Sequence, residues 1–331
     1  MEEYNIRYAT KNDIPAIKMF IDKNWKKDHI LVREEGFFEW QYTSDKLDYV
    51  IALDADKNIQ GMLGFISYDN NGERDIATSM WKANQGTGFL GIKLLMFTQK
   101  NEPHRTLFSP GINVRTSGRI YNRMGITLGK MNQWYRLHKQ SQYVVARIVD
   151  GNIPEILQHE KACLIRYNKI EDLLADFNFD LYVLKKTVPY KSLEYLKRRY
   201  FNHPSYNYLI YGVKADGKET SAVIVIKIQE CDELRVLRFI DCIGDLSAIM
   251  YISTCLDNLL EKTNSEYIDM YEKGLDEKML KFAGWTKLDE TENIIPNYFT
   301  PYEQRNVEIH YCTTDDNIVL FKGDGDQDRP N

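Results

Sequence analysis

The chain has 331 residues, of which 43% are hydrophobic and 27% are charged, and its formal net charge is -5. These values predict an ordinary globular protein that is long enough to form two domains. A mild negative charge gives no general attraction for nucleic acid or for an anionic membrane, so we expect neither as a partner. With no signal-like N-terminal segment and no apolar run of membrane-spanning length, the expected location is the cytoplasm.

The five cysteines are widely spaced and form no C-x-x-C pair. This spacing argues against a disulfide framework and against a structural zinc site, and it fits a reducing compartment. The six histidines are scattered along the chain, so no metal is expected. No heptad pattern stands out, and the sequence leaves a monomer and a homodimer equally open.

The N-terminal part predicts a strand at residues 5–9 and a helix that begins near Thr10 or Asn12, with Pro15 in its first turn. Apolar side chains at Ile17, Phe20, Ile21 and Trp25 then follow one face of that helix. An aromatic cluster at residues 37–42 comes next, followed by two predicted strands, at residues 49–53 and 60–68.

A glycine-rich loop is the first feature with chemical meaning. The apolar strand at residues 76–83 leads into a loop at residues 84–91, which opens a helix at residues 92–99. A helix start offers free N–H groups and the positive end of the helix dipole, which together suit a phosphate. Gly86, Gly88 and Gly91 would let the backbone approach such an anion closely. Three glycines can also form nothing more than a loose turn.

The same order of elements occurs twice in the chain. In the first copy a strand near residues 106–113 precedes a short helix that ends at Gly125; in the second copy the strand at residues 266–270 precedes a helix that ends at Gly284. Upstream, the second copy has a strand at 234–240 and a helix at 247–261. Asp245 stands where the first copy has its glycines and would repel phosphate, so only the first copy is expected to hold an anion.

Between the copies we expect a strand at residues 143–148 and a domain boundary near residue 152. The predicted domains are therefore residues 1–151, for cofactor binding and catalysis, and residues 152–331, a degenerate copy for acceptor binding. The predicted fold class is α/β (α+β), with a mixed, largely antiparallel sheet flanked by helices in each lobe.

The loop Gln85-Gly-Thr-Gly88 and a tyrosine, Tyr121, four residues before a glycine resemble the GNAT superfamily of N-acetyltransferases. In that family an Arg/Gln-x-x-Gly-x-Gly/Ala loop holds the pyrophosphate of coenzyme A; here Leu90 replaces the final small residue. The resemblance implies a coenzyme A thioester as cosubstrate, without a metal. It implies these cofactor-binding residues: Trp81, Lys82, Ala83, Gln85, Gly86, Thr87, Gly88, Phe89, Gly91 and Asn113.

Two side chains are candidates for proton transfer. Tyr121 could protonate the departing thiolate, as the tyrosine at the matching place does in the family. Glu39, in the aromatic cluster, is the candidate general base by the same analogy. The alternatives are a packed core tyrosine, a surface carboxylate, and an acceptor amine that needs no base. Asn113 is as readily a turn-forming residue.

The ending Asp326-Gln-Asp-Arg-Pro-Asn331 resembles that of tandem GNAT-like proteins of bacterial surface-polysaccharide pathways, including O-antigen synthesis. Those proteins acylate the amino group of a nucleotide-linked deoxyamino sugar. The resemblance implies transfer of an acetyl or 3-hydroxyacyl group to a dTDP- or UDP-linked amino sugar. It implies that the acceptor contacts Trp40, Tyr42, Asp326, Asp328 and Arg329. A non-catalytic acyl-CoA sensor and an aminoacyl-tRNA-dependent peptidyltransferase-like enzyme are the alternatives.

Overall fold

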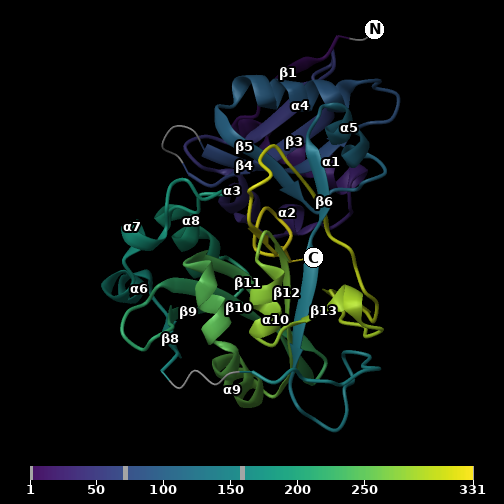
Figure 1. Ribbon diagram of the computed structural model, residues 1–331. Helices are drawn as coiled ribbons and strands as arrows, with labels where there is room; N and C mark the ends of the chain where they lie inside the picture. The colour runs from purple at the N-terminus through teal and green to yellow at the C-terminus, as the bar shows by residue number, and fades with distance from the viewer. Residues whose placement is uncertain (1–2, 70–73, 157–160, 331) are drawn as a thin grey trace. The chain divides into compact units, whose positions relative to one another are not determined.

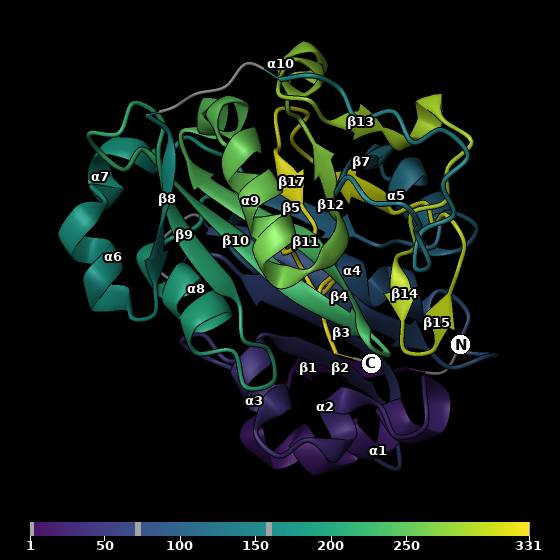
Figure 2. The same cartoon turned by 90° about the horizontal axis from the view of Figure 1, so that it is seen from below.

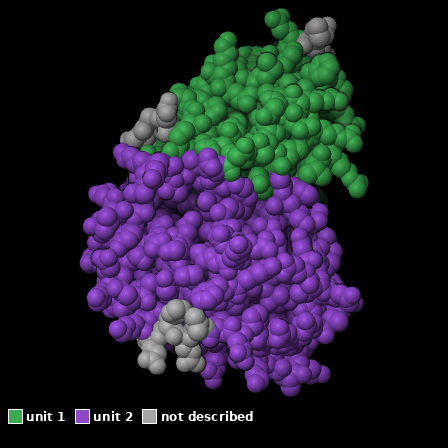
Figure 3. Space-filling model, viewed as in Figure 1, with its two compact units in different colours: residues 1–128, 311–316, 325–331 green, residues 129–310, 317–324 purple. Residues whose placement is uncertain are grey.

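The computed structural model describes residues 3–69, 74–156 and 161–330 (Figure 1). The chain divides into two compact units, coloured separately in Figure 3. Unit 1 comprises residues 1–128, 311–316 and 325–331, and unit 2 comprises residues 129–310 and 317–324. The predicted boundary near residue 152 therefore falls inside unit 2, and two segments from the end of the chain belong to unit 1.

The sheet of unit 1 has seven strands; β4 and β5 are parallel, and the pairs β1–β2, β2–β3, β3–β4 and β5–β16 are antiparallel. In spatial order its strands are β1 (Asn5–Tyr8), β2 (Tyr49–Leu53), β3 (Ile59–Ser67), β4 (Arg74–Ala83), β5 (His104–Pro110), β16 (His310–Thr313) and β6 (Thr127–Lys130). The strands predicted at residues 49–53, 60–68 and 76–83 are confirmed within a few residues.

The α-helices of unit 1 are α1 (Ile14–Asn24), α2 (Ile30–Arg33), α3 (Phe37–Tyr42), α4 (Leu90–Asn101) and α5 (Ser117–Arg123), with a 3-10 turn at Lys11–Asp13. Thr10 and Asp13 form the capping box that starts the first helical segment, and Pro15 lies in the first turn of α1. α4 packs Leu90, Leu94 and Leu95 into the core of the sheet. Burying such aliphatic side chains contributes about 1.5–3 kcal/mol each.

Unit 2 contains an eight-stranded sheet with one parallel pair, β11–β12. Its order is β13 (Thr286–Lys287), β7 (Asn132–Leu137), β12 (Ser265–Lys273), β11 (Leu234–Gly244), β10 (Ala222–Cys231), β9 (Leu209–Lys214) and β8 (Cys163–Tyr167), with β17 (Leu320–Phe321) also paired to β12. A separate hairpin consists of β14 (Tyr298–Phe299) and β15 (Tyr302–Glu303).

The helices of unit 2 include α9 (Ser253–Thr263), which lies against one face of the sheet (Figure 2). Its buried side chains join the core cluster that contains Phe239 and Ile268. The other helical segments are α6 (Ile170–Asp176), α7 (Phe179–Tyr182), α8 (Leu193–Leu196), a π turn (Lys197–Phe201), two 3-10 segments (Leu246–Tyr251 and Leu288–Glu290) and α10 (Glu277–Phe282).

The two sheets repeat one topology. Each has successive antiparallel strands that end in a parallel pair, β4–β5 in unit 1 and β11–β12 in unit 2. In each sheet the place beyond the parallel pair is filled by a strand from the other half of the chain. β16 lies beside β5, and β7 lies beside β12. The duplication seen in the sequence is therefore also an exchange of strands.

The helix ends of the two copies match in hydrogen bonding. Gly125 and Gly284 both have positive φ, at 75° and 76°. The N–H of Ile126 donates to the carbonyl of Tyr121, and the N–H of Trp285 donates to that of Leu280, both at 3.0 Å. This is the 6→1 bond of a Schellman motif, which a glycine after the helix permits. Tyr121 and Leu280 thus occupy equivalent places, as the sequence alignment predicts.

Two predicted elements of unit 2 are wrong. Residues 143–148 form no strand; instead the N–H groups of Val144, Val145 and Ala146 donate to the carboxylate of Glu266. The helix predicted at residues 247–261 is interrupted at Ile252, where a 3-10 segment gives way to α9. Among the described residues, no helix combines the length and the apolarity needed to cross a membrane.

Candidate active site

A separation of β4 from β5 opens the sheet of unit 1. The two strands pair from Arg74 and His104 to Ala77 and Phe108. Beyond that point β4 continues beside β3, whereas β5 continues beside β16. Each strand keeps one neighbour and loses the other, so main-chain N–H and C=O groups on the facing edges have no strand partner there.

A β-bulge in β4 lies directly after this separation. Ser79 pairs with Gly64 and Lys82 pairs with Met62, so Met80 and Trp81 together face the single residue Leu63. Met80 has a φ of 48°, in the left-handed region that non-glycine residues rarely adopt. Bulges increase local twist and redirect side chains, and they are frequent beside active sites.

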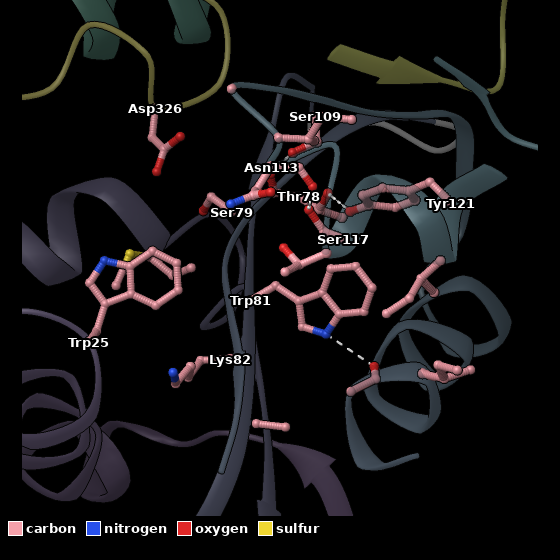
Figure 4. Close-up of a pocket in the computed structure, with 18 of the residues that line it drawn as sticks. Trp25, Thr78, Ser79, Trp81, Lys82, Ser109, Asn113, Ser117, Tyr121 and Asp326 are labelled. Carbon is pink, nitrogen blue, oxygen red and sulfur yellow. Dashed lines mark hydrogen bonds between the residues drawn. The ribbon is translucent and has the colours of Figure 1, made fainter. Parts of the chain in front are cut away.

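The separated strands border a cleft of about 820 Å³ within unit 1 (Figure 4). It is lined by the end of β4, the loop before α4, the loop between β5 and α5, α5 itself, and the C-terminal tail, which we define as residues 325–330. Of the predicted site residues, these line the cleft: Trp81, Lys82, Ala83, Thr87, Gly88, Phe89, Gly91, Asn113, Tyr121, Asp326 and Arg329.

The loop that precedes α4 has the features of an anion site. Gly86 and Gly88 have φ values of 84° and 63°, and a Cβ on either would meet nothing within 4 Å. Thr87 fixes the turn, because its hydroxyl donates to the Asn84 carbonyl at 2.7 Å. α4 begins without a side-chain cap and without an acidic residue in its first turn. The N–H of Leu90, the first residue of α4, donates to the Thr87 carbonyl at 3.3 Å. The next N–H groups, of Gly91 and Ile92, and the helix dipole are available to a negatively charged ligand.

The packing of Leu90 explains why a large residue stands where the motif of the GNAT loop has a small one. Leu90 is fully buried in the core of unit 1, where its side chain lies 3.2 Å from the position a Cβ on Gly61 would take. Gly91, one residue later, lines the cleft, and its carbonyl accepts a hydrogen bond from the indole Nε1 of Trp81 at 3.0 Å. Phe89, by contrast, is 74% exposed at the cleft. The predicted residues Gln85 and Gly86 do not line it.

Tyr121 lies on α5 and is 1% exposed. Its hydroxyl shares a hydrogen bond of 2.7 Å with the Thr78 hydroxyl, and its ring packs against Trp81 with centroids 5.3 Å apart. Burial, and then the nearby Cys312 thiol, raise the pKa of Tyr121 well above its usual value. The phenol therefore stays protonated and can act as a hydrogen-bond donor or as an acid.

The opposite side of the cleft combines an aromatic ring with charges. Trp25, Lys82 and Asp326 lie there, across β4 from Trp81 and Tyr121 (Figure 4). Asp326 Oδ2 accepts a hydrogen bond from Arg329 Nη1 at 2.7 Å. Trp25 was predicted to continue the buried face of α1, but it follows the helix as its C-cap residue and is 44% exposed. We call this the tail side, and the side with Thr87, Gly91 and Tyr121 the loop side.

Besides Gln85 and Gly86, four predicted residues lie outside the cleft lining. Tyr42 is fully buried, and its hydroxyl shares a hydrogen bond of 2.8 Å with Ser79, which does line the cleft. The ring of Trp40 packs against Phe37. Asp328 is buried. Glu39 lies on α3, and its Oε2 is buried without a hydrogen-bond partner among the described residues.

Asn113 lines the cleft, but its side chain is partly committed to the backbone. Its Oδ1 accepts the N–H of Arg115 at 2.9 Å, the geometry of an Asx turn. The turn-forming alternative is thus present in the structure. Other lining residues escaped the sequence reasoning: Ser79, Met80, Ser109, Ser117 and Gln327. Nothing in the local sequence marks them, because strand separation and the return of the tail bring them together.

The corresponding region of unit 2 is filled by its own chain. Val319 and Phe321 of the segment 317–324 line a cavity of only about 30 Å³ beside Cys242 and Gly244, at the end of β11. A cavity of that size has room for little more than water. Asp245 caps the following 3-10 segment by accepting the N–H of Ser247 at 3.0 Å. Unit 2 by itself therefore offers no anion site at this place.

A buried ion cluster fixes the segment that fills this region. Lys191 forms ion pairs with both Asp241 and Asp324. The distance from its Nζ to Oδ1 of Asp324 is 3.0 Å. Tyr200 donates its hydroxyl hydrogen bond to Asp241. In the described part of the chain no group of three or more His, Cys, Asp or Glu side chains is arranged to hold a metal ion.

No protein-family model matches this sequence, and no curated protein sequence matches it. Solved structures do. A GCN5-related N-acetyltransferase of Anabaena variabilis ATCC 29413 aligns at a TM-score of 0.57 with 10% identity, covering 94% of this chain and 72% of that one. The chain has the GNAT fold in two tandem lobes.

Two further solved structures are similar to this chain over most of its length. A conserved protein of unknown function from Enterococcus faecalis V583 aligns at a TM-score of 0.59 with 7% identity, over 93% of this chain and 72% of that one. A protein of Pyrococcus horikoshii that is grouped with the acetyltransferases aligns at 0.53 with 10% identity, over 96% and 92%. The similarity to the GNAT fold extends over nearly the whole chain, both lobes included, and it supports the predicted fold class.

Proposed function

We propose that the protein is an N-acyltransferase that moves an acyl group from coenzyme A to an amine in the cleft of unit 1. One observation carries this proposal. An uncapped helix start after a glycine loop and a protonated tyrosine converge on a cleft that two separated strands open. This is the set of groups that transfer from an anionic thioester requires.

The residues of the loop side fit coenzyme A. The N–H groups at the start of α4 would bind its pyrophosphate, and the unpaired edge of β4 would hydrogen-bond the amides of the pantetheine arm. Main-chain N–H groups near Trp81 to Ala83 would polarise the thioester carbonyl. Tyr121, held by Thr78, would give a proton to the thiolate that leaves. Bringing both reactants together can lower the barrier by about 7–11 kcal/mol.

The residues of the tail side support a nucleotide-linked amino sugar as acceptor, dTDP- or UDP-linked. An exposed indole such as Trp25 offers a flat apolar face for a sugar ring. Lys82 is a cation suited to the diphosphate, and Asp326, which is paired with Arg329, is an anion suited to an ammonium group. Acylation of such a sugar for surface-polysaccharide synthesis, including O-antigen, is the role we propose.

The proposal is tested by thiol release from acetyl-CoA and from 3-hydroxyacyl-CoA, with purified protein and a panel of dTDP- and UDP-linked amino sugars. Release that depends on one sugar supports the transferase and identifies its acceptor. A matched panel of the same sugars with a hydroxyl in place of the amine is the control. Silence with every amine, while calorimetry still detects acetyl-CoA binding, would refute the transferase and favour an acyl-CoA sensor.

A further inference from the structure

The tail side of the cleft contains a carboxylate whose role the fold alone does not explain. Among the described residues that line the cleft, Asp326 is the only aspartate or glutamate. Its side chain points from the tail toward the space between Trp25 and Ser79 (Figure 4).

Among the described residues, only one of the two oxygens of Asp326 has a hydrogen-bond partner. Oδ2 accepts from Arg329 at 2.7 Å. Oδ1 keeps its capacity to accept a hydrogen bond from a ligand in the cleft. The guanidinium of Arg329 thus fixes the carboxylate from one side and leaves its other side facing the cavity.

The residues on both sides of Asp326 are anchored within unit 1. The N–H of Gly325 donates to the Tyr68 hydroxyl at 2.8 Å, and Gly325 has a φ of 59°. On the other side, Gln327 Nε2 donates to the Pro110 carbonyl at 3.2 Å. A Cβ on Gly111 would lie 1.8 Å from that Nε2, so the tail packs directly on the loop after β5. Asp326 is therefore held at a fixed point of the cleft.

We propose that Asp326 binds the ammonium form of the acceptor and takes its proton, and that Arg329 is a positioning residue that orients the carboxylate. This inference rests on the proposed function and adds the identity of its base. A carboxylate at hydrogen-bond distance attracts an ammonium group and, once the proton has moved, releases a neutral amine. The acceptor class is then a primary amine that arrives protonated.

The proton balance is complete. One ammonium proton passes to Asp326 and then to water, and the nitrogen lone pair forms the new C–N bond with the thioester carbon. The C–S bond breaks as the carbonyl re-forms. Tyr121 gives its proton to the thiolate, and the second proton that the nitrogen loses as it becomes an amide restores the phenol. The sum is acyl-CoA plus ammonium giving amide, free thiol and one proton.

The geometry favours Asp326 over Glu39, the base expected from sequence. Glu39 does not line the cleft, and its Oε2 is buried on α3. A base must come within about 2.6–3.2 Å of the proton it takes, directly or through one water. Asp326 meets the first condition for such contact, exposure to the same cavity as Tyr121.

The test compares the Asp326→Asn variant with the wild type, using acetyl-CoA and the amino sugar that the panel identifies. We expect kcat/KM at pH 7 to fall by about 10²- to 10⁴-fold. The defect should shrink as the pH rises above the amine pKa, near 8, because more of the acceptor is then already neutral. Acetyl-CoA affinity by calorimetry should stay within about threefold. Glu35→Gln, at an exposed carboxylate outside the cleft, is the matched control.

The outcomes separate the two proposals. If the wild type releases no thiol with any amine, both the proposed function and this inference are refuted. An active wild type with Asp326→Asn within threefold of it at pH 7 overturns the role of Asp326 alone. So does a defect that stays constant from pH 6 to pH 9, since a merely structural loss would show that behaviour. Arg329→Lys should give a smaller loss in kcat than Asp326→Asn, with the same recovery at high pH.

Discussion

Replacing Tyr121 by phenylalanine removes one oxygen atom and leaves the packing of the ring. The lost hydroxyl makes a 2.7 Å hydrogen bond with Thr78, worth about 0.5–1.5 kcal/mol of stability. Thr78 Oγ1 also lies 3.5 Å from the Phe108 carbonyl, so it keeps a partner. We therefore expect Tyr121→Phe to lower the free energy of unfolding by only about 1 kcal/mol.

The effect on turnover should be larger than the effect on stability. Loss of a positioned acid lowers the rate by about 10²- to 10⁴-fold, which corresponds to about 3–5 kcal/mol of activation free energy. The assay is kcat for thiol release, with acetyl-CoA affinity by calorimetry and stability by urea unfolding on the same samples. Acetyl-CoA affinity should not change, because the ring still packs against Trp81.

A matched control is Tyr49→Phe. Tyr49 is also fully buried in unit 1, and its hydroxyl donates to the Met62 sulfur at 3.2 Å. Neither residue lines the cleft. Its turnover should match the wild type. A Tyr121→Phe enzyme that retains a third or more of the wild-type kcat would refute the role of the phenol as an acid.

Three further changes test the physical reasoning. Gly88→Ala forces a residue with a Cβ to adopt a φ of 63°, which costs about 1–2 kcal/mol. If the loop relaxes to avoid this strain, acetyl-CoA affinity should fall roughly five- to thirtyfold. Unchanged affinity together with unchanged stability would contradict the strain. Lys191→Met leaves Asp241 and Asp324 buried without their cation, so the free energy of unfolding measured in urea should fall by about 3–5 kcal/mol. A decrease of less than about 1 kcal/mol would mean that the cluster does not stabilise unit 2. Burial, and then the charge of Arg329, lower the pKa of His29 to about 3. The unfolded chain binds a proton at His29 near pH 6.5 and the folded chain does not, so stability should fall as the pH drops from 6.5 toward 3, by up to about 1.4 kcal/mol per pH unit. His29→Asn can keep the hydrogen bond to the N–H of Leu31 and should flatten this dependence of stability on pH. Equal slopes for the variant and the wild type would refute the assignment.

Local sequence rules predicted the elements whose cause is local. Gly125 and Gly284 end their helices because only a left-handed residue completes the Schellman bonds, and glycine adopts that conformation without strain. Thr10 and Pro15 mark a helix start for equally local reasons. The strand–loop–helix order of the first copy follows from such signals.

Elements that depend on distant partners could not be predicted in this way. The apolar run at residues 143–148 has the composition of a strand, but Glu266, more than 100 positions away in the sequence, takes its N–H groups. β7 and β16 contribute to sheets that the other half of the chain begins, and a local pattern does not name the sheet that a strand joins.

The candidate site shows the same division. The glycine loop and Tyr121 were predicted from a motif and the family that it resembles; Tyr121 and the later part of the loop, from Thr87 on, line the cleft. Asp326 and Arg329 were named only through a resemblance, because nothing in their sequence shows that the tail packs against Pro110 and Tyr68. Glu39 and Trp40 were chosen by the same kind of analogy, and the structure places them outside the cleft lining.

The exchange of strands has a consequence for synthesis on the ribosome. Unit 1 begins to emerge first, yet the strand beside β5 and the tail that carries Asp326 are made only after most of unit 2. Early domains usually fold as they emerge, but here the first unit must wait with the edge of β5 unpaired. Such an edge can capture a strand from another chain. The order of translation thus exposes the nascent protein to misassembly until β16 arrives, and it delays a complete active site until the last residues of unit 1 have been added.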